Sequence, residues 1–251
     1  LAIITLPHGP EEIAEADLRQ LLRGCTDVLS LVGATLIGGH TGRGEELGFG
    51  LSVNGLARRD HLFRKSGLRP GQDLILTKPL GTGVLFAGLM RGVSKASWIE
   101  SALSTMDQSS LAALDVLRRF DVSACTDVTG FGLAGHLMEM LNASGADAML
   151  HPASVPVLAG APELLAQGIE SSLAPENRKF GKSVRNLSTV PPEAVALLFD
   201  PQTAGGLLVG IEADKAQRCV EALNAVGFAS ARRIGSVTAR SYDRVAITLV
   251  N

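Results

Sequence analysis

The most informative segment of this chain reads Thr126-Asp127-Val128-Thr129-Gly130-Phe131-Gly132-Leu133. It follows an apolar run at residues 122–126, which is typical of a buried strand, and it opens a helix with one apolar face. An acidic residue that ends a buried strand, just before glycines that begin a helix, occupies the position at which α/β folds bind ligands. We therefore predict that Asp127 lies at the ligand-binding edge of a sheet.

The side chains of this segment allow more than one interpretation. The Asp127 carboxylate suits Mg²⁺, a hard cation that takes oxygen ligands from proteins and phosphates. Alternatively, Asp127 only caps the following helix. His136, one turn into that helix, is expected to be structural rather than a ligand. Cys125 is expected to be a core residue of the strand and no nucleophile, because no sequence neighbour would lower the pKa of its thiol.

Outward from this segment, strands and helices alternate along the chain. Strands are predicted at residues 1–6, 34–37, 47–53, 73–78, 122–126, 206–211 and 245–250. Helices are predicted after Pro10 and Gly83, and around residues 111–120, 133–141, 195–199 and 214–225. The strand at 47–53 alternates apolar with small or polar residues, so we expect it to bury one face. Strands and helices that alternate with glycine-rich corners indicate a layered α/β arrangement.

A charged connection at residues 60–71 ends in the turn signal Leu68-Arg69-Pro70-Gly71 and predicts a domain boundary. The chain opens on Leu1-Ala2-Ile3-Ile4-Thr5-Leu6, which is typical of a strand inside a domain. We therefore expect this sequence to be part of a longer protein.

Composition excludes several classes of protein. Among 251 residues, 46% are hydrophobic and 19% are charged, a balance that supports a large core and argues against disorder. A net charge of −2 does not suit a nucleic-acid surface. No apolar run approaches the about 18 residues of a membrane span. The three cysteines, an odd number and widely spaced, argue against a disulfide framework and fit a reducing cytoplasm.

Three other glycine-rich segments could carry chemistry. Gly38-Gly39-His40-Thr41-Gly42-Arg43-Gly44 follows a predicted strand, so it is either an anion-binding loop or an ordinary turn. Lys78-Pro79-Leu80-Gly81-Thr82-Gly83 lacks the residue order of a P-loop. In Asp200-Pro201-Gln202-Thr203-Ala204-Gly205-Gly206-Leu207-Leu208, the polar side chains of Gln202 and Thr203 either bind a ligand or stabilise a turn.

In their order along the chain, the four segments resemble the selenophosphate synthetases (selenide, water dikinases) of the AIR-synthetase-like superfamily. The resemblance spans nearly the whole chain. Related enzymes such as thiamine-monophosphate kinase and AIR synthetase carry an acid where this chain has His40, so the first segment discriminates best within the superfamily.

The resemblance implies an AIR-synthetase-like two-domain architecture of the α+β or α/β class. Residues 1–62 would be the C-terminal part of an ATP-binding domain that pairs with its twin in a homodimer to form a β-barrel. Residues 71–251 would be a layered α/β domain beside it, with ATP between the two and Mg²⁺ on its phosphates.

The resemblance also implies an activity for the parent enzyme: selenide, ATP and water would give selenophosphate, AMP and phosphate. Asp127 would bind Mg²⁺, and Gly39, His40 and Thr41 would contact a nucleotide held mainly by the partner subunit. The family's catalytic Cys or selenocysteine, its nearby Lys and further metal-binding Asp residues would lie upstream of Leu1. No catalytic residue is therefore assigned to this chain, and by itself it is expected to be inactive.

Two alternatives stay open at this point. One is another enzyme of the superfamily, such as a thiamine-monophosphate kinase or a hydrogenase-maturation dehydratase, although His40 and the segment 200–208 argue against both. The other is a module that binds nucleotide or dimerises without catalysis.

Overall fold

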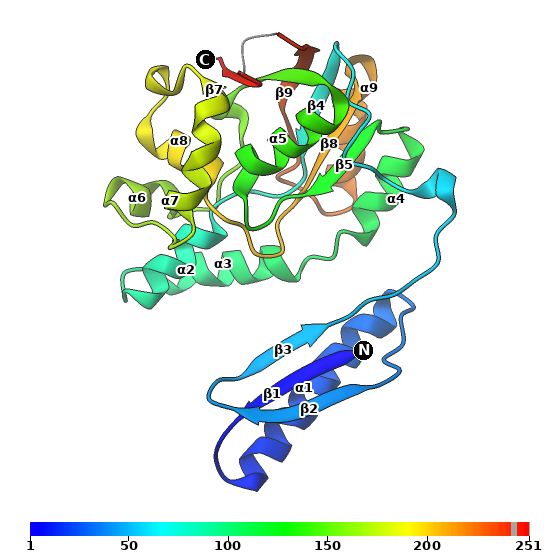
Figure 1. The fold of residues 1–251 in the computed structure, drawn as a ribbon, viewed down its shortest axis with the longest axis vertical. Helices are drawn as coiled ribbons and strands as arrows, with labels where there is room; N and C mark the ends of the chain where they lie inside the picture. Colours follow the sequence, from blue (N-terminus) through cyan, green and yellow to red (C-terminus); the bar gives the residue numbers. More distant parts are fainter. Residues whose placement is uncertain (242–244, 251) are drawn as a thin grey trace. The chain divides into compact units, whose positions relative to one another are not determined.

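The structure is a computed structural model that describes residues 1–241 and 245–250. The chain forms two compact units, Leu1–Asp60 and His61–Asn251 (Figure 1). Among the described residues, none of the helices combines the length and the apolar character needed to cross a membrane.

Unit 1 is a three-stranded sheet with one helix on it. Its elements are β1 (Ala2–Pro7), α1 (Glu11–Leu31), β2 (Gly39–Gly44) and β3 (Gly48–Leu51). β1 is the central strand, parallel to β2 and antiparallel to β3. Alternate residues of β1 point to the same face, so Ala2, Ile4 and Leu6 form a small core with Ala14 and its neighbours on α1.

The glycine segment of unit 1 is itself a strand. We predicted a strand at residues 34–37 followed by a glycine loop, and this was wrong: residues 34–38 have no regular structure and β2 begins at Gly39. Glycine allows this pairing because the backbones approach closely. A Cβ on Gly39 would lie 1.9 Å from the Ala2 carbonyl oxygen, and one on Gly44 would lie 2.6 Å from Thr5 Cγ2.

β3 does not bury an apolar face within unit 1. The strand is shorter than the predicted 47–53, and its Phe49 and Leu51 side chains are 43% and 42% exposed. On the sheet face turned away from α1, Ile3 lies between His40 and Gly50, and Thr5 lies between Gly42 and Gly48. Three of these four cross-strand positions are glycines, and Ile3 is 61% exposed on this face.

Unit 2 is built on a seven-stranded mixed sheet with the order β5-β8-β4-β9-β6-β10-β7. The strands are β4 (Gln72–Leu76), β5 (Ala124–Asp127), β6 (Ala146–Leu150), β7 (Val184–Arg185), β8 (Leu207–Glu212), β9 (Arg232–Ala239) and β10 (Ile247–Leu249). The pairs among the first five strands of that order are antiparallel, and β10 is parallel to both of its neighbours. The sheet is thus not the parallel one that alternating strands and helices commonly form.

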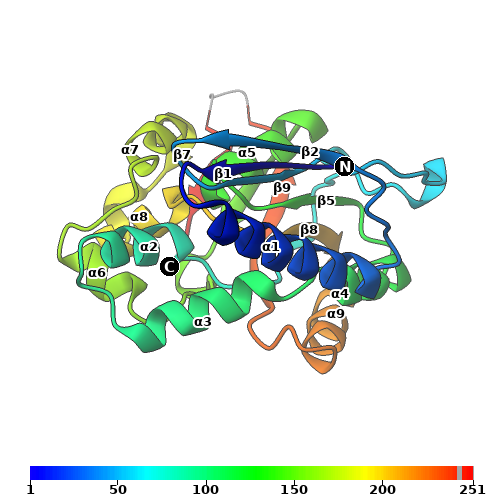
Figure 2. The same ribbon diagram turned by 90° about the horizontal axis from the view of Figure 1, so that it is seen from below.

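Helices cover both faces of this sheet and make three layers (Figures 1 and 2). They are α2 (Thr82–Met90), α3 (Ala96–Asp107), α4 (Leu111–Arg119), α5 (Gly132–Ser144), α6 (Ala161–Ala166), α7 (Ala174–Asn177), α8 (Pro192–Phe199) and α9 (Ala213–Ala225). The larger core joins one face to α2, α3, α5, α6 and α8. The smaller core joins the other face to α4 and α9. In β4, Leu74 and Leu76 belong to the larger core and Ile75 to the smaller, as strand alternation requires.

β5, the strand that ends at Asp127, lies at one edge of the sheet and is secured along its length. The chain before β4 covers its free edge, where Cys125 N–H donates to the Arg64 carbonyl over 2.8 Å. Gly67 passes so close that a Cβ on it would lie 2.3 Å from the Ser123 carbonyl oxygen. The edge strand therefore has hydrogen-bonding partners on both sides.

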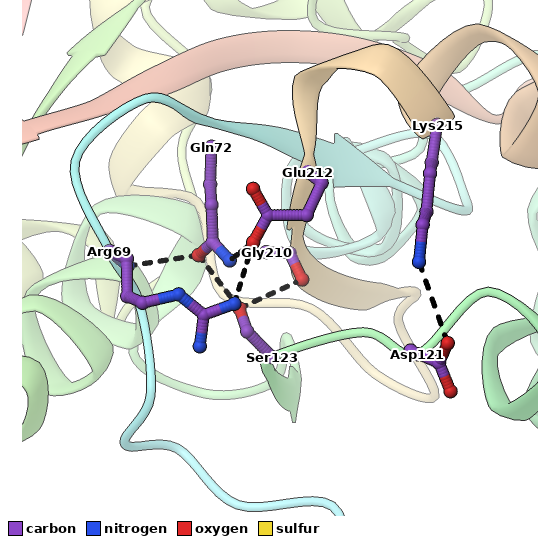
Figure 3. Close-up of polar contacts among 7 residues, drawn as sticks. All are labelled: Arg69, Gln72, Asp121, Ser123, Gly210, Glu212 and Lys215. Carbon is purple, nitrogen blue, oxygen red and sulfur yellow. Dashed lines mark hydrogen bonds and ion pairs between the residues drawn. The ribbon is translucent and has the colours of Figure 1, made fainter.

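A polar network fixes the start of β5, four residues before Asp127 (Figure 3). The Ser123 hydroxyl donates to Gln72 Oε1 over 2.8 Å and contacts the Gly210 carbonyl at 3.1 Å. Gln72 Nε2 donates to Glu212 over 2.8 Å, and Arg69 forms a 2.6 Å ion pair with the same carboxylate. The network thus ties the start of β5 to its neighbour β8 and, through Gln72, to β4, the next strand of the sheet.

Candidate functional site

Three of the four glycine-rich segments meet at one end of the unit 2 sheet. Val128 N–H donates to the Gly206 carbonyl over 2.8 Å, and Gln202 N–H donates to the Thr129 carbonyl over 3.0 Å. Thr203 N–H donates to the Thr82 hydroxyl over 3.0 Å. The segments 78–83, 126–133 and 200–208, far apart in sequence, therefore form one structure around the loop that follows Asp127.

Gln202 is the centre of this structure. Its side chain is buried, and its Oε1 accepts from Gly81 N–H, Thr82 N–H and the Thr82 hydroxyl over 3.0, 3.2 and 3.1 Å. Its Nε2 donates to the carbonyl oxygen and to Oδ2 of Asp200, both over 2.9 Å. Because these bonds use both ends of the amide, Gln202 stabilises the turn and does not contact a ligand. Thr203, in contrast, is exposed.

The glycines of these segments are required by close packing. A Cβ on Gly205 would lie 2.1 Å from the Val128 carbonyl oxygen, and one on Gly83 would lie 2.6 Å from Asp200 Oδ1. Gly132 has a φ of +68°, which favours glycine, and it packs against the backbone of α8. The glycines therefore bring three backbone segments together.

Lys78 connects the segment 78–83 to the segment 200–208. Its side chain is buried, and Nζ donates to the carbonyls of Gln108 and Ala204 over 2.7 and 3.1 Å. Burial lowers the pKa of Lys78, and the nearby Asp107 carboxylate opposes that change. With its ammonium group bonded to backbone carbonyls inside the protein, Lys78 is not placed to bind a phosphate.

Asp200 is a buried carboxyl group at the amino end of α2. Burial raises its pKa to about 7, while the Gln202 amide and the N–H groups of Gly83 and Val84 oppose the rise. Those N–H groups point towards the carboxylate, yet Oδ1 accepts no hydrogen bond of acceptable geometry from any described residue. Asp200 therefore titrates near neutrality.

Asp127 is the last residue of β5, and its side chain is exposed, whereas the three residues before it are buried. The structure gives its carboxylate no hydrogen bond or ion pair with another described side chain. Phe131 occupies the N-cap position of α5, and none of the described side chains forms a capping hydrogen bond there. The capping interpretation of Asp127 therefore finds no support, and its carboxylate is available to a ligand.

His136 on α5 takes part in a chain of polar contacts with Thr129 and Glu139. Its Nε2 is 3.2 Å from the Thr129 hydroxyl, and its Nδ1 is 3.1 Å from Glu139 Oε2. Lys65 Nζ donates to the same Glu139 oxygen over 2.8 Å. Burial lowers the pKa of His136, and the carboxylates of Glu139 and Asp127 oppose that change.

Sequence reasoning did not find Thr129, Glu139 or Lys65. A signal was present for one of them, because His136 and Glu139 are three residues apart and such residues are neighbours on a helix. The contact between Lys65 and Glu139 spans 74 residues and has no local signature. His136 contacts the side chains of Thr129 and Glu139, and its structural role stays a prediction.

Cys125 has the properties of a core residue. Its side chain is buried in the smaller core, and burial, reinforced by the Asp127 carboxylate, raises the pKa of its thiol to about 12. A thiol with that pKa is protonated at neutral pH and is a poor nucleophile. No nucleophilic role is therefore expected for it.

The remaining segment, with Gly39, His40 and Thr41, belongs to unit 1. All three residues are exposed on β2. They lie at a hollow of about 480 Å³ that is also lined by Ala2, Ile4, Leu22, Leu36, Ile37 and Gly38. Arg43 does not line this hollow, and its side chain donates to the Pro7 carbonyl over 3.3 Å. The three residues are accessible to a ligand.

The Asp127 carboxylate fits Mg²⁺ in kind, since an exposed carboxylate with no partner among the described side chains is a good ligand for a hard cation. Among the described residues, no group of three or more His, Cys, Asp or Glu side chains is arranged to hold a metal ion. Asp127 therefore suits a cation that takes most of its ligands from water and phosphate, as Mg²⁺ commonly does in phosphoryl-transfer sites.

Comparison with known protein families identifies the larger unit. Residues 69–248 match the family "AIR synthase related protein, C-terminal domain". Among curated proteins, the chain is 38% identical to a selenide, water dikinase of Pelobacter propionicus over 231 residues, which covers 92% of this chain and 66% of that protein. It is 36% identical to a selenide, water dikinase of Desulfitobacterium hafniense, with 96% and 70% covered. The chain spans about two thirds of the length of these relatives.

Solved structures of other proteins share the fold. The hydrogenase maturation protein HypE of E. coli superposes with a TM-score of 0.69 at 17% identity, covering 100% of this chain and 69% of that one. The thiamine monophosphate kinase of Aquifex aeolicus gives a TM-score of 0.59 at 14% identity, covering 99% and 72%. The expected AIR-synthetase-like fold class is thus confirmed. The chain belongs to the AIR synthase related family and, within it, to the selenide, water dikinases.

Proposed function

We propose that the full-length protein makes selenophosphate from selenide, ATP and water and releases AMP and phosphate. The family membership supports this reaction class. The observation that carries the proposal is the exposed Asp127 carboxylate at the end of β5, which has no side-chain partner among the described residues and precedes a loop held in place by two other glycine-rich segments. A rigid loop positions a ligand group without an entropic cost at the moment of binding.

In this proposal Asp127 would help to hold Mg²⁺, and the metal would neutralise negative charge on the ATP phosphates. The cation would offset repulsion among those oxygens as charge develops on them. What the chain itself contributes is placement: the hydrogen bonds of Val128 and Thr129 fix the loop, and the polar network at Ser123 fixes the strand before it.

Gly39, His40 and Thr41 would contact the nucleotide from unit 1, and residues 1–57 would pair with a second copy in a homodimer. The support for these assignments is the exposure of all three residues at a hollow of that unit and the unburied apolar residues of its sheet. An exposed sheet face in so small a unit favours burial against another chain. The proposed location is the cytoplasm, where three free cysteines are stable.

The proposal is tested by assaying the full-length protein for AMP release from ATP, with and without selenide under anaerobic conditions. We expect AMP formation that depends on both selenide and Mg²⁺. Thiamine monophosphate serves as the competing acceptor. Phosphorylation of thiamine monophosphate with no selenide-dependent AMP would overturn the proposal.

A further inference from the structure

A groove of about 540 Å³ on unit 2 contains none of the residues of the four glycine-rich segments. It is open to solvent and is lined by residues of the short 3-10 helix η2 (Pro152–Ser154), of α6 and of α8. Figures 1 and 2 show α6 and α8 at the side of unit 2 opposite α4 and α9. The lining includes Val155 and Leu197, which are buried members of the larger core. The groove therefore has an apolar floor.

Prolines stand at the start of all three helices that line the groove. Pro152 is the first residue of η2, Pro162 is the second of α6, and Pro191 immediately precedes α8. Because proline has no N–H, these positions offer no donor to the main chain of a ligand. An extended peptide that adds to a sheet edge depends on such main-chain bonds, whereas a helix satisfies its own. The walls of the groove therefore suit a helix better than an extended strand.

Among the described residues, the only charged groups that line the groove are the carboxylates of Glu163 on α6 and Glu193 on α8. Glu163 is exposed and Glu193 is half-buried, and neither side chain forms a hydrogen bond or ion pair with another described residue. Each stands in the first turn of its helix, where a carboxylate suits the helix dipole. Since no side chain neutralises them, the two carboxylates favour a cationic group on the molecule that fills the groove.

The sequence around the groove is free of basic residues. Lys and Arg occur 23 times in the chain, yet none occurs between Arg119 and Arg178 or between Arg185 and Lys215. Every residue that lines the groove belongs to one of these two intervals. The groove is therefore acidic as well as apolar.

We propose that this groove binds an amphipathic helix of a partner protein, with apolar side chains in the groove and Lys or Arg side chains against Glu163 and Glu193. A helix that occupies a groove buries its apolar face there and is recognised by residues about one turn apart. Opposite charges at the rim fix the partner and its orientation more than they strengthen binding. The proposal is independent of the proposed synthesis of selenophosphate, and its test does not use that activity.

The probe is a fluorescent synthetic helix of about 15 residues, because shorter isolated helices are barely stable in water. Leu forms one face of the peptide and Lys flanks that face. One matched peptide has Glu in place of Lys, and a second has Gln in place of Leu. Fluorescence anisotropy measures their binding to the full-length protein at about 0.15 M salt, which screens attraction between exposed charges.

We expect the Leu/Lys peptide to bind at least about tenfold more tightly than either matched peptide, a difference of about 1.4 kcal/mol. Equal binding of the peptide without Leu would show that charge alone is recognised and would overturn the proposal. Equal binding of the peptide without Lys would overturn the role of the two carboxylates.

Glu163→Lys combined with Glu193→Lys reverses the charge of the groove. This double variant should bind the Leu/Lys peptide about tenfold more weakly than the parent does and the Leu/Glu peptide more tightly. Glu100→Lys combined with Glu221→Lys is the matched control, because it changes the net charge equally at exposed positions on α3 and α9. The control should bind like the parent. Equal losses in the two double variants would place the peptide elsewhere and overturn the groove as its site.

Thermal unfolding and sedimentation are recorded for every variant. Lysine in the first turn of a helix opposes the helix dipole, so Glu163→Gln combined with Glu193→Gln replaces the Lys variant if the latter unfolds. The Gln variant should weaken binding of the Leu/Lys peptide about threefold. A parent that does not bind the peptide, together with a groove variant that loses self-association, would assign the groove to a second copy of the chain and overturn the partner helix.

Discussion

Gln202 Nε2 lies 2.9 Å from the carbonyl oxygen of Asp200 and 2.9 Å from its Oδ2, so one amide group binds both the backbone and the side chain of the same residue. Oδ2 is thereby satisfied, whereas Oδ1 faces the amino end of α2 without a proper hydrogen bond. A buried carboxyl group with one unsatisfied oxygen favours its protonated form. The free energy of unfolding should therefore depend on pH through Asp200.

Asp200 should make the protein less stable as the pH rises from about 4 to about 7. Its pKa in the folded state is about 7, against 3.8 for a free carboxyl group, so the folded protein holds one more proton in that interval. The free energy of unfolding should fall by up to about 1.4 kcal/mol per pH unit there, and level off above pH 7. Asp200→Asn, which cannot ionise, should lack this part of the slope. Urea unfolding from pH 4.5 to 8 measures it, with exposed Asp214→Asn as control. A variant with the slope of the parent would contradict the assignment.

Gln202→Ala should destabilise unit 2 by about 2–4 kcal/mol. The substitution leaves the buried donors of Gly81 and Thr82 without an acceptor, and unsatisfied buried groups cost about 1–3 kcal/mol each. Thr203→Ala is the matched control, since Thr203 is exposed and should change stability by less than about 0.5 kcal/mol. Chemical unfolding at constant pH compares the two variants. Equal stabilities would show that the turn does not depend on the Gln202 side chain.

Asp127→Asn in the full-length protein should lower selenide-dependent AMP formation at least about a hundredfold, or about 2.7 kcal/mol of transition-state stabilisation. The melting temperature should hardly change, because the Asp127 side chain is exposed and caps no helix. Activity and thermal unfolding are measured on the same preparation. Near-normal turnover with an unaltered Mg²⁺ dependence would exclude the metal role.

Ile3→Lys should weaken the proposed homodimer. Ile3 is 61% exposed on the central strand, between His40 and Gly50, and a lysine there would bury its charge against a second copy. Ile13→Lys replaces an isoleucine that is 59% exposed on α1 and is the control. Sedimentation at micromolar concentration should show a dimer for the parent and for Ile13→Lys only. A parent protein that sediments as a folded monomer would refute the dimer.

Cys125 and Cys219 should resist alkylation in the folded protein. Burial raises the pKa of their thiols to about 12 and about 11, so neither forms appreciable thiolate at pH 8. Mass spectrometry after iodoacetamide treatment should find both unmodified, and both modified once urea is added. Rapid modification of native Cys125 would indicate a reactive thiol and contradict its role as a core residue.

Local sequence patterns predicted the elements whose side chains follow a clear period. α1, α4 and α9 have apolar residues at helical spacing, and the buried run of β4 is continuous. β9 was not predicted, although it lies in the middle of the sheet, because its sequence Arg-Arg-Ile-Gly-Ser-Val-Thr-Ala is largely polar. Its Gly235 is needed where Met149 O approaches, a contact that only the folded sheet reveals.

The position of Asp127 followed from the order strand, acid, glycines, and the structure has it at the end of β5. What joins the segments could not be read locally. Gln202 and Thr82 are 120 residues apart, so the choice between ligand binding and turn stabilisation for Gln202 depended on tertiary contacts. The β2 error has a related cause, since glycine-rich sequences are typical of turns and only the close approach of β1 makes a strand of this one.

The contact between Cys125 N–H and the Arg64 carbonyl sets a limit on how the larger unit can be shortened. The family match begins at residue 69, after the segment that covers β5. A fragment that began there would leave the outer edge of this strand with free donors and acceptors, and such edges recruit strands from other molecules. We expect that fragment to aggregate, whereas one that begins at His61 should stay dispersed in solution.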